Sequence, residues 1–118
     1  MWSSVQNPHF NNRGYIDVTA KYRCYTGTGQ LSASVILWGC GTYKPRTPLT
    51  EGDLQRNCYK EGTNSRTFSP PTTGTTYGNP VTAPPNSFGS VHQWYVACSM
   101  HTTSGSTTVL SWSNIVYL

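Results

Sequence analysis

Four stretches of the chain alternate apolar and polar side chains with a period of two, at residues 15–25, 31–39, 90–100 and 108–118. In the first stretch the apolar members are Ile16, Val18, Ala20, Tyr22 and Cys24. Because successive side chains of a β-strand point to opposite faces of the sheet, this period predicts strands with one buried face and one solvated face. It excludes an amphipathic helix, whose apolar positions recur at every third or fourth residue.

Glycine-containing segments join these stretches in pairs. Residues 26–29 hold two glycines, and residues 102–107 surround Gly105. Such short polar connections between alternating stretches predict two β-hairpins, one in each half of the chain.

The remaining segments carry weaker patterns. Residues 1–14 are predicted to form an irregular lead-in, with a short strand near residues 2–5. Residues 48–55 predict a single helical turn with Thr50 as its N-cap and Asp53 three positions on. We expect a short strand at residues 56–59 and a paired edge strand at residues 75–81, in a region rich in Pro, Thr and Gly.

The composition agrees with an all-β fold. Only 10% of the 118 residues are charged and the net charge is +4, against about 25% charged residues in a typical soluble domain. Ser and Thr together number 30, whereas the strong helix formers are scarce. No apolar run approaches the roughly 18 residues of a membrane span. We therefore expect residues 1–118 to form one secreted domain, an antiparallel β-sandwich of about seven strands.

Four cysteines are present, at positions 24, 40, 58 and 98. No C-x-x-C motif occurs, so a zinc ribbon or a thioredoxin-like site is not expected. We interpret the four as two disulfides, which places the protein in an oxidising, extracellular compartment. Cys24 and Cys98 lie on the apolar faces of patterned strands, and we expect them to pair across the sandwich, leaving Cys40 to pair with Cys58. Pairing of Cys24 with Cys40 and of Cys58 with Cys98 stays open.

The order Cys24, Trp38, Cys98 resembles the Cys…Trp…Cys spacing of immunoglobulin-like β-sandwiches. The resemblance implies a Trp packed against a disulfide between the sheets. Simple alternation puts Trp38 on the opposite face of its strand, so a bulge near Leu37 would be needed to turn it inward. More loosely, the chain resembles small secreted proteins of actinobacteria, and the lack of an Asn-x-Ser/Thr sequon also favours a bacterial source.

Few residues are available for catalysis. The acids are Asp17, Glu51, Asp53 and Glu61, and the histidines are His9, His92 and His101. No nucleophile motif accompanies them, and residues 92 and 101 fall on opposite faces of a strand, so they do not make a metal pair. We expect no enzyme activity, no cofactor and no metal. The eight basic residues are too dispersed to predict nucleic-acid binding.

The aromatic residues favour binding instead. Tyr43, Tyr59 and Tyr77 lie in Gly- and Pro-rich segments, and together with Trp38 they are the predicted contact residues. The sequence therefore predicts a non-catalytic secreted recognition or adaptor module for a protein partner or a glycan, either free or as a subunit of an extracellular assembly. The alternatives are a small secreted inhibitor or toxin-type effector, whose contact loop would be residues 69–86, and an enzyme of unknown class.

Overall fold

The computed structural model describes residues 2–23, 29–41, 48–68, 74–84, 94–103 and 108–117. Within these ranges it contains eight strands and one short helix. They are β1 (Trp2–Val5), β2 (His9–Phe10), β3 (Ile16–Arg23), β4 (Leu31–Cys40), α1 (Glu51–Asn57), β5 (Tyr59–Phe68), β6 (Thr76–Ala83), β7 (Trp94–Thr103) and β8 (Val109–Trp112). The fold is all-β, as predicted from the alternating stretches.

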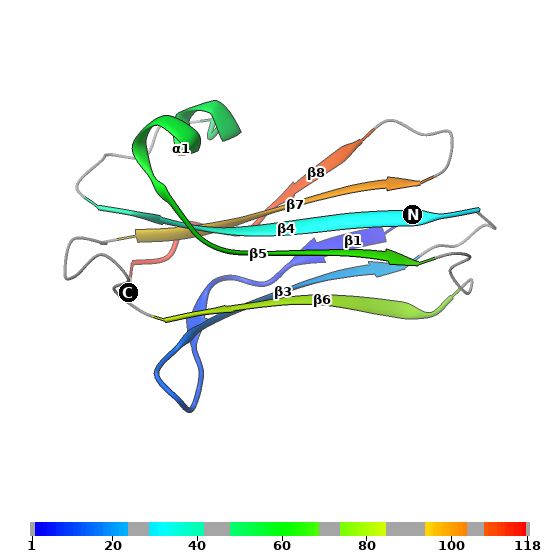
Figure 1. Ribbon diagram of the computed structural model, residues 1–118, viewed down its shortest axis with the longest axis horizontal. Coiled ribbons are helices and arrows are strands. Elements are labelled where there is room, and N and C mark those ends of the chain that lie inside the picture. The colour runs from blue at the N-terminus through cyan, green and yellow to red at the C-terminus, as the bar shows by residue number, and fades with distance from the viewer. Residues whose placement is uncertain are drawn as a thin grey trace.

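The strands form two antiparallel sheets that lie one on the other (Figure 1). In the first sheet, β3 pairs along its whole length with β6, while β1 and β2 pair with its two ends. The second sheet has the order β5-β4-β7-β8. The four alternating stretches thus supply β3 to one sheet and β4, β7 and β8 to the other.

One of the two predicted hairpins is confirmed and the other is wrong. β7 and β8 pair with Cys98 opposite Trp112 and His101 opposite Val109. β3 and β4 do not pair, because they belong to different sheets. Each carries one strictly apolar face, and these faces cover each other across the two layers, which side-by-side pairing in one sheet does not achieve.

The main core lies between the sheets. Its buried members are Ile16, Val18, Ala20 and Tyr22 from β3, Leu31, Ala33, Val35 and Leu37 from β4, Val81 and Ala83 from β6, and Tyr95 and Ala97 from β7. Alternate residues of each strand point into this layer, as a sandwich requires. The predicted edge strand at residues 75–81 is confirmed as β6, whose buried residues alternate with exposed ones.

A second core covers the outer face of the second sheet beneath α1. It contains Ile36, Trp38, Cys40, Leu54, Trp94 and Val96. α1 begins after Thr50, whose side chain accepts a hydrogen bond from the backbone N–H of Asp53 (3.2 Å), so the predicted cap is confirmed. The helix continues to Asn57, and the predicted short strand at residues 56–59 is therefore wrong.

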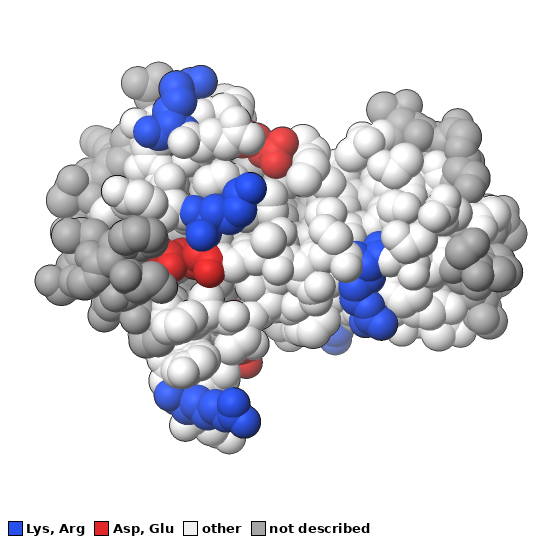
Figure 2. Space-filling model, viewed as in Figure 1, with Lys and Arg blue, Asp and Glu red and all other residues white. Residues whose placement is uncertain are grey.

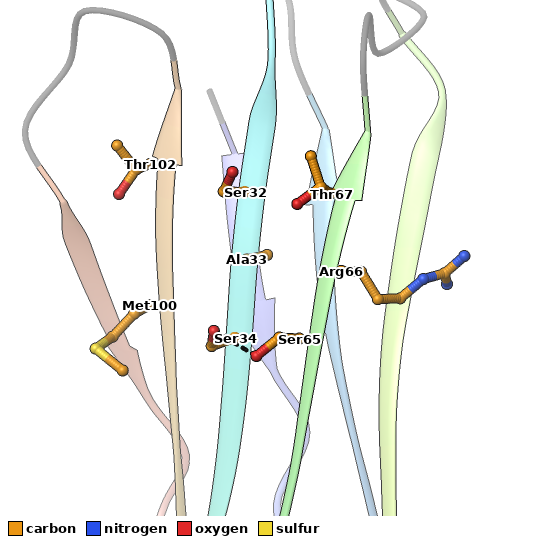
Figure 3. A pocket seen from close by; sticks show the side chains of 8 residues that line it. All are labelled: Ser32, Ala33, Ser34, Ser65, Arg66, Thr67, Met100 and Thr102. Carbon is orange, nitrogen blue, oxygen red and sulfur yellow. Dashed lines mark hydrogen bonds between the residues drawn. The ribbon is translucent and has the colours of Figure 1, made fainter.

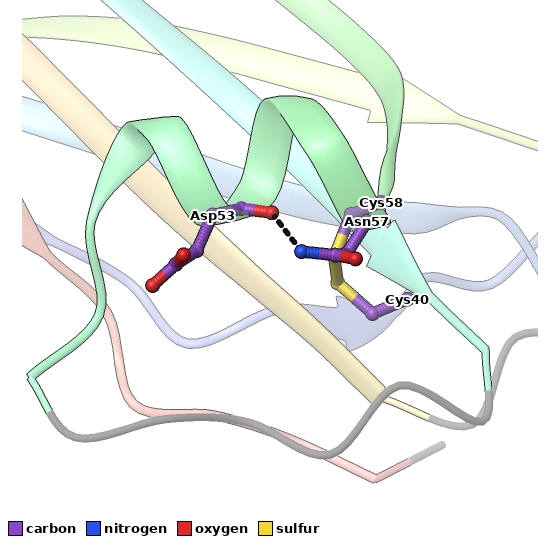
Figure 4. Close-up of a disulfide and its surroundings, with 4 residues drawn as sticks. All are labelled: Cys40, Asp53, Asn57 and Cys58. Atoms are coloured by element: carbon purple, nitrogen blue, oxygen red, sulfur yellow. Dashed lines mark hydrogen bonds between the residues drawn. A yellow bond between two sulfur atoms is a disulfide. The ribbon is translucent and has the colours of Figure 1, made fainter.

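The disulfide between Cys40 and Cys58 is confirmed (Figure 4). It joins the end of β4 to the residue that follows α1. Beside it, the Asn57 side chain donates a hydrogen bond to the Asp53 carbonyl oxygen (2.9 Å), which closes the last turn of the helix. These contacts hold α1 on the sheet although the helix is too short to be stable alone.

The predicted disulfide between Cys24 and Cys98 is wrong, because Cys98 is a buried free thiol. Cys98 lies opposite Ile36 and Trp112, on the outer face of the second sheet, and not on the face toward β3. A disulfide across the sandwich needs both sulfurs between the sheets. Cys24 itself lies outside the described residues.

Trp38 is also on this outer face, packed in the second core. The register between β4 and β5 shifts at Leu37 and Trp38, as the sequence suggested, but the extra residue is Glu61 of β5. β4 keeps its alternation and Trp38 does not turn inward. At Gly39 a Cβ would lie 2.7 Å from an oxygen of the Glu61 carboxylate, so a larger residue there would require the Glu61 side chain to move.

Candidate functional site: the hairpin of β2 and β3

The aromatic residues predicted from the sequence do not form a common surface. Trp38 is 2% exposed and offers no ring face to a ligand. Tyr77 is half-buried at the start of β6, where its ring packs on Phe68 with the centroids 4.3 Å apart. Tyr59 is 51% exposed at the start of β5, at the other end of the sandwich from the Phe68–Tyr77 pair. Tyr43 lies outside the described residues.

A shallow hollow of about 230 Å³ lies on the outer face of the second sheet, beyond the part that α1 covers (Figure 3). Its lining residues are mostly small and hydroxylated: Ser32, Ala33, Ser34, Ser65, Arg66, Thr67, Met100 and Thr102. Ser34 and Ser65 hydrogen-bond each other (2.9 Å), and Arg66 points away to donate to the Gly78 carbonyl (2.6 Å). The hollow therefore presents neutral hydroxyls and lacks an acid–base pair among its lining residues.

Two exposed aromatic residues lie close together in the chain, Phe10 at the end of β2 and Tyr15 immediately before β3. Phe10 is 51% exposed and Tyr15 is 40% exposed. The turn between them extends away from both sheets, on the side opposite α1, as the blue turn at the bottom of Figure 1 shows. Turns and loops that a rigid scaffold holds in place often carry binding residues, so this turn is a candidate interaction site.

Asn11 fixes the shape of this turn. Its side-chain oxygen accepts hydrogen bonds from the backbone N–H groups of Arg13 (2.8 Å) and Tyr15 (3.0 Å). Its own backbone N–H donates to the Tyr15 carbonyl (2.8 Å), and its carbonyl accepts from the N–H of Gly14 (3.0 Å). An asparagine that bonds its own downstream backbone in this way forms an Asx-turn. Four hydrogen bonds thus converge on one residue.

The side chain of Asn11 also connects the turn to the first sheet. Its amide nitrogen donates to the Asp17 carboxylate (3.1 Å), which also accepts from the Thr82 hydroxyl of β6 (2.6 Å). Gly14 has φ +77°, in the left-handed region that favours glycine. Hydrogen bonds of the hairpin's own side chains, together with Gly14, therefore define the backbone of the turn.

The strand register places the two aromatic rings on different faces. Phe10 lies opposite Ile16, whose side chain is buried toward the second sheet, so Phe10 is on that side of the hairpin. His9 lies opposite Asp17 on the other side. Tyr15 precedes β3, but the backbone hydrogen bond from Asn11 to Tyr15 continues the pairing by one residue, so alternation puts Tyr15 on the same side as Asp17. The hairpin thus carries one aromatic ring on each face and Arg13 in the turn.

Charge on the molecule is sparse. On the face shown in Figure 2 the Lys and Arg side chains lie apart from one another, and a few acidic side chains separate them. Within the described ranges no group of three or more His, Cys, Asp or Glu is placed to hold a metal ion. No helix in those ranges is long and apolar enough to cross a membrane.

The groups with shifted pKa values lie in the interior. Burial lowers the pKa of His101, raises the pKa of the Tyr22 phenol and raises the pKa of the Cys98 thiol to about 12. Shifted pKa values often mark active sites. Here the three side chains are 5% exposed or less, and the cause is desolvation within the packed interior. They mark the core and not a reactive surface.

Sequence reasoning missed the hairpin because residues 1–14 carry no alternation. The signal that was available is Asn11 followed three residues later by Gly14, which is a combination of turn residues with a defined geometry. Comparison with protein-family models, with curated proteins and with solved structures gives no match to this chain.

Proposed function

We propose that the protein is a non-catalytic recognition module that binds a protein partner through the β2–β3 hairpin. The observation that carries this proposal is the pair of exposed rings, Phe10 and Tyr15, on a turn held by the hydrogen bonds of Asn11. Tyr, Trp and Arg dominate the energetics of protein interfaces, and rigid presentation lowers the entropy cost of binding.

A protein partner fits this surface better than a glycan does. The rings project from two faces of a narrow turn and do not form the coplanar platform on which sugar rings stack. The proposal includes an extracellular location, which the Cys40–Cys58 disulfide supports. Two packed antiparallel sheets are compatible with an immunoglobulin-like arrangement, and the bacterial source stays a prediction from the sequence.

The same hairpin favours a second candidate function, that of a secreted inhibitor. Inhibitors present a rigid protruding segment that changes little on binding. Such a segment was predicted at residues 69–86, but residues 76–83 form β6, and residues 69–73, 85 and 86 lie outside the described ranges. Among the described residues, the segment that protrudes is residues 9–15. An inhibitor would lower the activity of its partner, and an adaptor would leave that activity unchanged.

A photo-cross-linking amino acid introduced at Phe10 tests the recognition proposal. The probe is the protein fraction secreted by the source organism, and the matched control carries the same amino acid at Leu110, which is 47% exposed on β8. We expect an adduct of defined mass from position 10 and none from position 110. Adducts from position 110 alone, or from neither position, contradict the proposal.

A further inference from the structure

Phe10 and Tyr15 cannot both contact a flat surface, because they lie on opposite faces of the hairpin. A flat partner contacts one face of a β-ribbon and leaves the other in water. Burial of both rings requires a partner that surrounds the turn. Since a β-layer with its side chains is about 10 Å thick, the surrounding cleft must open to about that width.

The charge of the turn indicates what lines the cleft. Arg13 is the charged residue in the turn between Phe10 and Tyr15, and it is exposed. The nearest acid, Asp17, lies on the strand behind the turn and accepts hydrogen bonds from Asn11 and Thr82. His9 is likewise tied back, with its Nδ1 atom 3.0 Å from the carbonyl oxygen of Asn7. The leading end of the hairpin is therefore cationic.

The turn is also organised for insertion. A cleft that closes on a flexible loop must order that loop, and each ordered residue costs conformational entropy. Asn11 already holds the backbone of Arg13 and Tyr15 in place, and it is joined to the first sheet through Asp17. Binding through the two rings therefore does not have to offset a conformational entropy cost for ordering the turn.

From these three features we infer that the hairpin inserts as a wedge into an acidic cleft of its protein partner. Phe10 and Tyr15 contact opposite walls, and Arg13 meets carboxylates at the floor. This inference rests on the proposed function and adds to it the shape and charge of the partner. An arginine enclosed with carboxylates in a desolvated site is a common centre of binding energy.

The test uses two cross-linking variants, one with the photo-reactive residue at Phe10 and one with it at Tyr15, against the same secreted fraction. A wedge gives the same partner from both variants, cross-linked through two separate segments of that partner. An adduct from position 10 with none from position 15 overturns the wedge and leaves recognition intact. No adduct from position 10 overturns the proposed function itself.

The substitution Arg13→Glu tests whether carboxylates line the floor of the cleft. It is made in the protein that carries the photo-reactive residue at position 10. The control is Lys21→Glu, which makes the same charge change at an exposed residue of β3 away from the turn. We expect Arg13→Glu to lower the adduct yield about tenfold or more and Lys21→Glu to change it by less than about threefold. Equal effects of the two variants, or a higher yield with Arg13→Glu, overturn the acidic cleft. Both positions are exposed, so neither substitution disturbs the core.

Discussion

The phenol of Tyr22 hydrogen-bonds the hydroxyl of Ser99 across the interior of the sandwich. The pair joins β3 of the first sheet to β7 of the second at a point where both side chains are 0% exposed. The ring of His101 lies edge-on to Tyr22, with the centroids 5.6 Å apart. Because a buried polar group without a partner is costly, this contact favours one alignment of the two sheets over sliding alternatives.

Tyr22→Phe removes the phenol oxygen and leaves the Ser99 hydroxyl without this partner. We expect the free energy of unfolding to fall by about 1–3 kcal/mol, the usual cost of leaving one buried group unpaired. Adding Ser99→Ala to the same protein removes the orphaned hydroxyl and should recover part of the loss. Urea unfolding of the two variants measures both effects. A Tyr22→Phe protein as stable as the wild type would contradict the role assigned to the pair.

The burial of His101 gives the fold a dependence on pH. Its pKa is lowered from 6.5 because desolvation disfavours the charged ring. Below pH 6.5 the unfolded chain therefore binds a proton that the folded chain does not bind. His101 therefore does not lower the free energy of unfolding above pH 6.5. As the pH decreases from 6.5 toward the folded-state pKa, this residue lowers the free energy of unfolding by at most about 1.4 kcal/mol per pH unit.

Urea unfolding between pH 7.5 and pH 5 measures this slope. His101→Gln should flatten it relative to the wild-type protein. The comparison uses the slope and not the absolute stability, so a general loss of stability in the variant does not affect it. An unchanged slope in His101→Gln would show that another group causes the acid sensitivity.

The alternating stretches predicted β3, β4, β7 and the start of the last strand, together with the buried face of β3, but β8 ends at Trp112 with Leu110 exposed, and β5 was missed. β5 is an edge strand of ten residues with no regular apolar face. It is held by backbone pairing with β4, and its side chains add bonds to β6, where Asn64 donates to the Pro80 carbonyl (2.8 Å). The residues of β5 alone do not predict a strand, because this strand depends on its pairing with neighbouring strands.

The inner face of β7 could not be assigned from sequence either. β7 is buried on two sides near α1, so alternation does not distinguish its inner face from its outer one. Cys98 was therefore predicted to face the other sheet and lies on the outer face, whereas alternation along β4 correctly placed Trp38 on the face opposite Leu37. In the candidate site, only the turn from Asn11 to Gly14 could be predicted from the sequence. The exposure of Phe10 and Tyr15 could not be predicted, because it depends on how far the hairpin projects from the sheets.

Reduction of the Cys40–Cys58 disulfide should destabilise the protein by about 3 kcal/mol, given a sequence separation of 18 residues. The bond anchors the end of α1, so the loss should appear first as faster amide exchange in the helix, at Leu54 above all. Thermal unfolding of a Cys40→Ser/Cys58→Ser protein measures the total effect. Uniform acceleration of exchange in both sheets would contradict a local anchoring role.

Cys98 should be unreactive in the folded protein. Its thiol is 0% exposed and burial raises its pKa to about 12, so almost no thiolate is present at pH 8. We expect iodoacetamide to label Cys98 only after the protein is unfolded in urea. Peptide mapping without reductant checks the same point independently. Recovery of Cys98 in a disulfide with Cys24 would restore the pairing that the sequence predicted.

Asn11→Ala tests whether the hairpin is ordered by its own side chains. The substitution removes the oxygen that accepts from Arg13 and Tyr15 and the nitrogen that donates to Asp17. Since the turn is exposed and lies outside the core, global stability should fall by no more than about 1 kcal/mol, while amide exchange at positions 13 and 15 accelerates.

Asn11→Asp separates the two functions of this side chain. Its carboxylate still accepts from both backbone N–H groups, but it has no N–H to donate to Asp17 and adds a like charge beside it. We therefore expect slow exchange at positions 13 and 15 to be retained, with the base of the hairpin loosened. The cross-linking yield at Phe10 should then follow the order wild type, Asn11→Asp, Asn11→Ala. Equal yields in all three proteins would mean that order in the free hairpin does not contribute to recognition.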